Sequence, residues 1–226
     1  MVVTYITVLH NGILEEVMRV LICGHSKSVY QYQDYIAYNE FDLRIATYHW
    51  HGLDIGRHEF DVYAATKSPG RRLLRSLGIP AEKIISGYQH PSFFKANSRD
   101  PIEDFIMVPG SNHQDTVRTV QIKYACMQGA TEIVLVGHDY IENQWNKKYL
   151  HEAEEFNYTL KRSTGINGES PPARSFIVGY EYRHACIQKE KKMLKYCMGR
   201  WQDVDFYYLP SQKSEKKGVL LHENML

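Results

Sequence analysis

Four apolar runs of the sequence are each followed by a short polar set that contains a histidine. Imidazole, hydroxyl, amide and carboxylate groups can transfer protons and bind phosphate or sugar hydroxyls. If the apolar runs are parallel strands, their carboxyl ends lie at one edge of a sheet, where ligands of open α/β sheets bind. We therefore expect one site built from Gly24 to Ser28, Tyr48 to His51, Ser111 to His113 and His138 to Tyr140.

The first set, Gly24-His25-Ser26-Lys27-Ser28, lacks the glycines and the spacing of a Walker loop or of GxGxxG. Its backbone N–H groups and lysine could still cradle a phosphate at the start of a helix, as an alternative to a plain strand-to-helix turn. In the second set, His49 and His51 would lie on the same side of an extended strand and could bind a metal. Histidines of edge strands without metal are commoner, so we predict no metal site.

Three single residues could add chemistry to this site. Asp139 could cap the next element, bind a ribose hydroxyl or hold a cation. His113 lies near the start of a predicted helix, where the helix dipole disfavours its protonated form. His184 begins the predicted last helix, where it could act as a general base or have no role.

Short strands that alternate with helices must position these residues. Continuous apolar runs, ended by glycine, proline or polar clusters, indicate strands that are buried on both faces. The alternation predicts an α/β fold: a Rossmann-like three-layer sandwich with a mostly parallel sheet and a lid-like insertion before the last helix. The expected strands are residues 19–23, 42–47, 61–65, 82–86, 105–108, 133–136 and 204–208, and two expected helices are residues 67–77 and 184–198.

Residues 105–136 hold the clearest unit, a strand, an amphipathic helix and a second strand that we expect to be its partner in a parallel sheet. The helix is expected to start near Ser111 or Asn112, because each has an amide or acidic side chain three residues later, as in a capping box. Gly129 suits the residue after its last turn. One helical face carries Val117, Val120, Tyr124 and Met127.

One α/β domain is expected over residues 1–226, because this length supports a single sizeable core. In the N-terminal extension, residues 1–17, the pair Asn11-Gly12 indicates a hairpin at the edge of the sheet, with a peripheral helix as the alternative. Residues 141–179 include a stretch rich in glycine and proline and form the predicted lid region. Residues 212–226 form a tail that could be a docking segment, although we expect a frayed terminus.

Composition argues against several classes of function. A formal net charge of +1 provides no general basic surface for nucleic acid. The four cysteines form no CxxC pair and no zinc spacing, which is typical of a reducing compartment. The N-terminus is a poor match to a signal peptide, and no apolar run has the length of a membrane span. We expect a cytoplasmic protein without a transmembrane segment.

A longer pattern points to a known family. Gly129 to Asp139 (GATEIVLVGHD) is its most specific motif, and Tyr182-Arg183-His184, a helix and a strand ending near Pro210-Ser211 follow in order. With the strand and loop of residues 20–28, this order resembles the bacterial sialyltransferases of glycosyltransferase family 42. It is more distantly similar to a superfamily that includes motility-associated flagellin glycosylation proteins and 6-hydroxymethylpterin pyrophosphokinase. The resemblance covers residues 18–211 and is weak between residues 55 and 105.

The resemblance implies a nucleotide-sugar-dependent glycosyltransferase, which moves a sugar from a CMP-, UDP- or GDP-linked donor to a hydroxyl of a glycan or another acceptor. His184 would be the general base, and Tyr140 and Tyr149 would stabilise the departing phosphate. No cofactor is required, although Mg²⁺ could take part. The residues implied to bind the donor are Gly24, His25, Ser26, Ser28, Thr47, Ser111, Asn112, Thr116, Gly137, His138 and Asp139.

Three other functions stay open, because the family has asparagines where this chain has His25 and Thr47. An ATP-dependent pyrophosphokinase of the pterin type would need Mg²⁺ and carboxylates around Asp139. A glycosyltransferase acting on hydroxymethylated bases in DNA could use Arg71, Arg72 and Arg75 to contact phosphate. A non-catalytic nucleotide-binding module would keep the fold without the chemistry. A homo-oligomer is compatible with each of them.

Overall fold

The computed structural model describes residues 6–10, 13–24, 27–48, 60–66, 68–87, 105–112, 115–142, 175–210 and 218–226. An eight-stranded sheet runs through this part of the chain in the order β10-β9-β8-β3-β4-β5-β6-β7. All neighbouring strands are parallel except β9 and β10, which are antiparallel. The strands are β3 (Arg19–Cys23), β4 (Leu43–Thr47), β5 (Val62–Ala64), β6 (Ile84–Ser86), β7 (Ile106–Met107), β8 (Glu132–Val136), β9 (Asp205–Tyr208) and β10 (Val219–Leu220).

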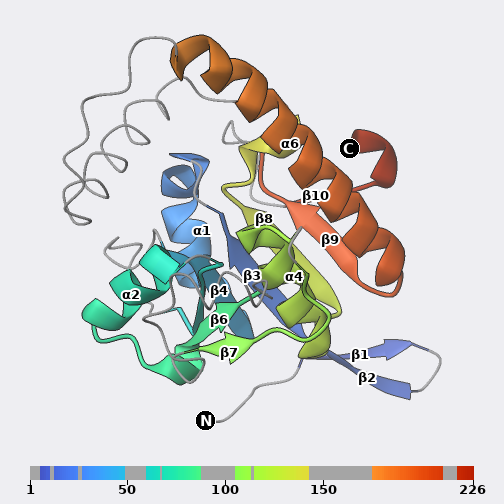
Figure 1. Cartoon of the computed structure of the whole chain (residues 1–226). Coiled ribbons are helices and arrows are strands. Elements are labelled where there is room, and N and C mark those ends of the chain that lie inside the picture. Colours follow the sequence, from blue (N-terminus) through green and yellow to red (C-terminus); the bar gives the residue numbers. More distant parts are fainter. Residues whose placement is uncertain are drawn as a thin grey trace.

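Helices cover both faces of the sheet (Figure 1). The 3-10 helix η1 (Lys27–Tyr32), α1 (Gln33–Tyr38) and α2 (Ser68–Ser76) pack on one face, and α4 (Val117–Met127) and α6 (Ser175–Arg200) pack on the other. Three short 3-10 helices, η3 (Ala81–Lys83), η5 (Asp139–Glu142) and η6 (Glu223–Met225), complete the helices of the described residues. The predicted α/β fold with a mostly parallel sheet is therefore confirmed, and all predicted strands are present with slightly different ends.

Strand β3 shows why the central strands read as continuous apolar runs. Val20 and Ile22 point into the core cluster under α4 and α6, whereas Leu21 and Cys23 point into the cluster under α1 and α2. All four residues are fully buried, because a strand in the middle of a sheet with helices on both sides has no solvent face.

The chain changes direction across the sheet at β3. From β3 it moves outward through β4, β5 and β6 to β7, and then returns to the other side of β3 to form β8 and β9. The helices of the outward half cover one face, and α4 and α6 cover the opposite face. Right-handed crossovers require this change of face when the direction reverses. The carboxyl ends of β3 and β8 therefore form a topological switch point, the place where open α/β sheets bind ligands.

The prediction that the two strands of residues 105–136 are partners is wrong. β7 pairs with β6 at the edge of the sheet, and β8 pairs with β3 and β9. Between β7 and β8 lie β3, β4, β5 and β6. A strand–helix–strand pattern sets the direction of its strands but does not say which strands pair, so the tertiary fold decided this point.

The helix of this unit begins later than expected. It starts at Val117, not near Ser111 or Asn112, and Thr116 is its N-cap, with the side-chain oxygen accepting a hydrogen bond from the Thr119 backbone N–H. Residues 108–116 are needed as a connection, because α4 must reach back from edge strand β7 to pack over β3, β4, β5 and β6. Gly129 follows the helix with φ of 95°, as its predicted capping role requires.

One residue of the predicted apolar face of α4 is misplaced. Val120 is buried, and Val117 and Tyr124 pack against the core, but Met127 is 48% exposed. The helix ends at Met127, and the chain turns toward solvent at the exposed Gln128 and Gly129.

Both ends of the chain also differ from expectation. Strands β1 (Ile6–His10) and β2 (Ile13–Val17) form a hairpin, but as a separate two-stranded sheet and not on the edge of the large one (Figure 1). The C-terminal residues 218–226 are not frayed, because β10 pairs with β9 and Leu221 is 3% exposed in the core. Apolar residues of the tail thus serve to cover the sheet edge.

The last helix, α6, begins at Ser175. His184 therefore lies inside it, not at its start, and residues 175–179 of the predicted lid region belong to the helix. Residues 143–174 of that region lie outside the described residues. In the part of the chain that the structure describes, no helix is long and apolar enough to cross a membrane.

Candidate functional site

The backbones of β3 and β8 meet closely at the switch point. The Gly24 N–H donates to the carbonyl of Val136 at 2.7 Å, and a Cβ atom on Gly24 would lie 2.2 Å from the carbonyl oxygen of Gly137. Backbone atoms cannot give way as a flexible side chain can, so position 24 requires glycine. Gly24 and Gly137 were predicted to bind the donor, and in the structure the glycine at position 24 has a packing role, because the loops after both strands must touch.

A side-chain hydrogen bond joins the same two loops. The hydroxyl of Ser28, at the start of η1, donates to the carboxylate of Asp139, and the Ser28 backbone N–H also interacts with that carboxylate. Burial is the larger effect and raises the pKa of Asp139 above its usual value, and the donors from Ser28 offset this only in part. Asp139 thus caps η1, an element more than a hundred residues before it in the chain. Of the three roles considered for Asp139, capping is the one that the geometry provides, although for an earlier element.

Three buried polar side chains lie around the peptide between Cys23 and Gly24. Gln121 of α4 donates from Nε2 to the Cys23 carbonyl at 3.4 Å, and the ring of His138 lies beside Gly24. Thr47 ends β4, directly after the residue that pairs with Cys23. Each of the three is at most 2% exposed. The hydroxyl of Thr47 and Oε1 of Gln121 have no hydrogen-bond partner among the described residues. Nε2 of His138 has none with good hydrogen-bond geometry either, although the Ile22 carbonyl is near enough to act on the ring.

The electrostatics around His138 favour its neutral form. Its Nδ1 lies 3.3 Å from the hydroxyl of Tyr140. The Arg118 guanidinium lies 5.0 Å from the centre of the Tyr140 ring, in cation–π geometry. Burial, and then the positive charge of Arg118, hold the pKa of His138 well below its usual value of 6.5, and the carbonyl of Ile22 opposes this shift. A buried neutral imidazole can donate or accept a hydrogen bond but carries no charge toward a phosphate.

Tyr140 is turned inward. It is 4% exposed within the core cluster under α4 and α6, and its hydroxyl faces His138. Burial raises its pKa, with the carboxylate of Glu190 adding to the shift. This hydroxyl is therefore within reach of His138, and its contact with a departing phosphate stays a prediction.

Helices α4 and α6 are joined by one carboxylate, that of Glu190. Its Oε1 lies 2.7 Å from Nη1 of Arg118, and its Oε2 accepts from the Thr116 hydroxyl at 2.7 Å. The Arg118 and Glu190 side chains are each 12% exposed. Thr116, predicted to bind the donor, therefore uses its hydroxyl for Glu190 and for the helix cap.

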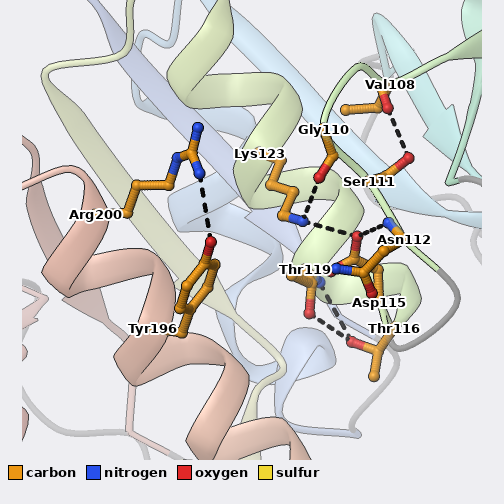
Figure 2. A network of polar contacts seen from close by, with 10 residues as sticks. All are labelled: Val108, Gly110, Ser111, Asn112, Asp115, Thr116, Thr119, Lys123, Tyr196 and Arg200. Atoms are coloured by element: carbon orange, nitrogen blue, oxygen red, sulfur yellow. Dashed lines mark hydrogen bonds and ion pairs between the residues drawn. The ribbon is translucent and has the colours of Figure 1, made fainter.

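A second polar network shapes the connection before α4 (Figure 2). Lys123 reaches back along the helix to the Gly110 carbonyl at 3.0 Å and to the Asp115 carboxylate at 2.8 Å. The same carboxylate accepts from the Asn112 backbone N–H at 2.6 Å, and the hydroxyl of Ser111 donates to the Val108 carbonyl at 2.6 Å. Asn112 and Asp115 make half of the predicted capping box, but before the helix and not at its first turn.

The structure brings together part of the predicted site. The carboxyl ends of the adjacent strands β8, β3 and β4 gather Gly24, Ser28, Thr47, Gly137, His138, Asp139 and Tyr140. Ser111 lies elsewhere along the edge, beside Gly87 at the end of β6, and Asn112 follows it as an exposed residue. The other predicted residues lie outside the described residues: His25, Ser26, His49, His51, His113 and Tyr149. His184 is placed only as a position within α6.

Sequence reasoning missed three residues of this region: Arg118, Gln121 and Glu190. All three lie in helices that read as amphipathic, where polar residues are usually assigned to the solvent face. The sequence did hold one signal for Gln121. It lies directly between the apolar Val120 and Ile122, and a polar residue within a buried stretch indicates a buried polar contact.

Within the described residues, no group of three or more His, Cys, Asp or Glu side chains could hold a metal ion. Comparison with known proteins adds no identity. No protein-family model matches the chain. No curated protein and no solved structure matches it significantly.

Proposed function

We propose that this protein is a nucleotide-sugar-dependent glycosyltransferase with a Rossmann-like fold that binds its donor at the switch point of β3 and β8. The observation that carries the proposal is the set of hydrogen-bonding atoms without described partners on Thr47, Gln121 and His138 around the Cys23–Gly24 peptide. A buried polar atom left unpaired costs about 1–3 kcal/mol, so three of them at one place favour a polar ligand there. Their location at a topological switch point is where such sheets bind nucleotides.

The chemistry of these atoms supports the nucleoside part of a donor. A hydroxyl, an amide oxygen and a neutral imidazole match the hydroxyls and amide-like edges of a nucleoside, which carry both donors and acceptors. None of the three is a cation, so the donor phosphates would bind nearby, at the loop that begins with Gly24.

In the proposed reaction, His184 removes the proton of an acceptor hydroxyl while that oxygen bonds to the anomeric carbon of the donor sugar. The bond from the anomeric carbon to phosphate breaks, and the nucleotide leaves with the electron pair. Residues 143–174 are proposed as a lid that limits hydrolysis by water. A cytoplasmic location remains a prediction. Tyr140 and Tyr149 keep their proposed contact with the leaving phosphate.

A donor panel tests the proposal directly. CMP-, UDP- and GDP-linked sugars are incubated with the protein, with and without Mg²⁺, and the released nucleotide is measured by mass spectrometry. Release from one donor class, abolished in His184→Ala with donor binding retained, is the expected result. Binding without release indicates a non-catalytic module. Binding of ATP with Mg²⁺ in place of any sugar nucleotide indicates the pyrophosphokinase alternative.

Thr47→Val separates ligand binding from folding. Because the Thr47 hydroxyl has no partner among the described residues, its loss should leave stability unchanged or higher, while donor affinity falls by about 3- to 10-fold, the value of one hydrogen bond. Thr131→Val is the matched control, since the Thr131 hydroxyl bonds to both the N–H and the carbonyl of Met18 at the other end of the sheet. That variant should lose stability and keep donor affinity. The reverse pattern would argue against a donor at this place.

A further inference from the structure

Helix α6 carries two kinds of contact with the rest of the molecule. Ile187, Leu194 and Cys197 form an apolar face in the core cluster under α4 and α6. Glu190 adds a polar contact to the same region, by its bonds to Thr116 and Arg118 of α4. Apolar faces hold a helix against a sheet but tolerate small shifts along its axis, whereas a carboxylate bound at both oxygens has one geometry.

The protons in this contact can be assigned. An ionised carboxylate can only accept hydrogen bonds, so the O–H of Thr116 is the group that donates to Oε2 of Glu190. The oxygen of Thr116 is also the N-cap of α4 and accepts from the Thr119 N–H. Arg118 donates to Oε1. Both carboxylate oxygens are thus used, one by a neutral and one by a charged donor, and the carboxylate holds the first turn of α4 against the middle of α6.

Further side-chain contacts connect Arg118 with the switch point. Arg118 lies over the ring of Tyr140, whose hydroxyl faces His138, and His138 packs beside Gly24. A row of contacts therefore connects Glu190 on α6 to the loops after β8 and β3. Glu190 is six residues, about 9 Å along a helix, from position 184.

We propose that Glu190 is a positioning residue that sets the register of α6 on α4 and so fixes where position 184 lies relative to the switch point. Replacing both partners of a largely buried ion pair by apolar residues often costs no stability, so our hypothesis is that this pair is retained because it fixes one arrangement of the two helices. Glu190 acts through Arg118 and Thr116 and touches no reacting atom. The contact itself stands on the geometry alone, and only its consequence for His184 rests on the proposed glycosyl transfer.

Glu190→Gln keeps the shape of the side chain and removes its charge. Hydrogen exchange followed by mass spectrometry should then show faster exchange in α6 and in residues 137–142, beyond what the loss of global stability, measured by urea unfolding, accounts for. Lys192→Gln is the control, because Lys192 is an exposed residue of the same helix, and its exchange pattern should match the unmodified protein. If Glu190→Gln does not fold, Glu190→Asp, which keeps the charge but shortens the reach, serves for the same measurement.

Catalysis distinguishes positioning from a purely structural role. With an active donor, Glu190→Gln should lower kcat by on the order of tenfold to a hundredfold while KM for the donor stays nearly constant. Arg118→Gln should have a similar effect, and the double variant should be no worse than either single one, because the two residues act in one path. Faster exchange with an unchanged kcat would overturn the positioning role.

The exchange measurement does not depend on the proposed function. If no donor is turned over, the glycosyltransferase proposal fails, and faster exchange in Glu190→Gln still supports the role of Glu190 in setting the register of α6. Unchanged exchange in both Glu190→Gln and Glu190→Asp would overturn the inference whether or not the protein is an enzyme.

Discussion

The hydroxyl of Ser28 donates a hydrogen bond to the carboxylate of Asp139, which lies 111 residues further along the chain. Ser28 follows β3 and Asp139 follows β8, so this bond ties the two loops that border the switch point. The contact of Gly24 with Gly137 lies directly beside it. Two contacts therefore hold the loops together: the backbone contact of Gly24 with Gly137 and the side-chain hydrogen bond of Ser28 with Asp139. Each contact leads to a prediction of its own.

Asp139→Ala should destabilise the protein by about 1–3 kcal/mol, because the N–H and hydroxyl of Ser28 then lose a buried acceptor. Asp139→Asn retains an acceptor oxygen and avoids the cost of burying a charge, the effect that raises the pKa of Asp139. The loss of unfolding free energy should therefore be clearly smaller for Asp139→Asn than for Asp139→Ala. Urea unfolding of the two variants measures this difference. Equal losses would show that the Ser28 contact contributes little.

Gly24→Ala should cost about 2–4 kcal/mol or prevent folding, since the added methyl group would overlap the carbonyl oxygen of Gly137. The control is Gly199→Ala near the end of α6, where the new Cβ would meet only Oε1 of Glu223 at an ordinary 3.7 Å. Replacing a helical glycine by alanine should stabilise by about 0.5–1 kcal/mol. Thermal unfolding checks both, and a tolerated Gly24→Ala would contradict the described packing of the two loops.

Stability should fall as the pH is lowered below about 6.5. The pKa of His138 is well below 6.5 in the folded protein because of burial and the nearby Arg118 charge. In the unfolded chain it titrates near 6.5, so between the two pKa values the unfolded state binds more protons. The loss approaches about 1.4 kcal/mol per pH unit for this one group.

A comparison of urea unfolding at pH 7.5 and pH 5.5 tests the histidine. His138→Gln, which removes the titrating group, should show a smaller decrease over this range than the unmodified protein. An equal decrease in both would assign the pH dependence to other groups.

The C-terminal residues should contribute to stability. Leu221 is 3% exposed and packs in the core cluster under α4 and α6, so Leu221→Ala should cost about 2–4 kcal/mol. Its neighbour Leu220 is 38% exposed, and Leu220→Ala should cost much less. Similar small losses for both variants in chemical unfolding would mean that the tail is not docked in solution.

Local sequence pattern was sufficient to predict the strands and the class of fold. A run such as Ile133-Val134-Leu135-Val136 can be satisfied only as a strand with cover on both faces, and the polar sets after such runs follow from where strands end. The need for glycine at position 129 was equally local, since the positive φ after a helix is a property of one residue.

Pairing was not predictable, because nothing in residues 105–136 distinguishes a neighbouring strand from one that lies across the sheet. The start of α4 was also predicted wrongly from local pattern. Asp115 has the spacing of a capping-box residue, but in the folded protein its carboxylate accepts from Lys123 and from the Asn112 N–H before the helix begins. The tail looked like a frayed end because an exposed edge of β9 for it to cover exists only in the folded sheet.

The sequence by itself determined the α/β class, the central strands and the polar groups that follow them, because these depend on residues close together in the chain. The tertiary structure alone decided that β3 and β8 are adjacent, that Asp139 binds Ser28, and that Glu190 joins α6 to α4. These contacts connect residues from 72 positions apart, for Arg118 and Glu190, to 113 positions apart, for Arg19 and Glu132 (132 − 19). Their partners become neighbours only when the reversal of direction at β3 brings the second half of the chain beside the first.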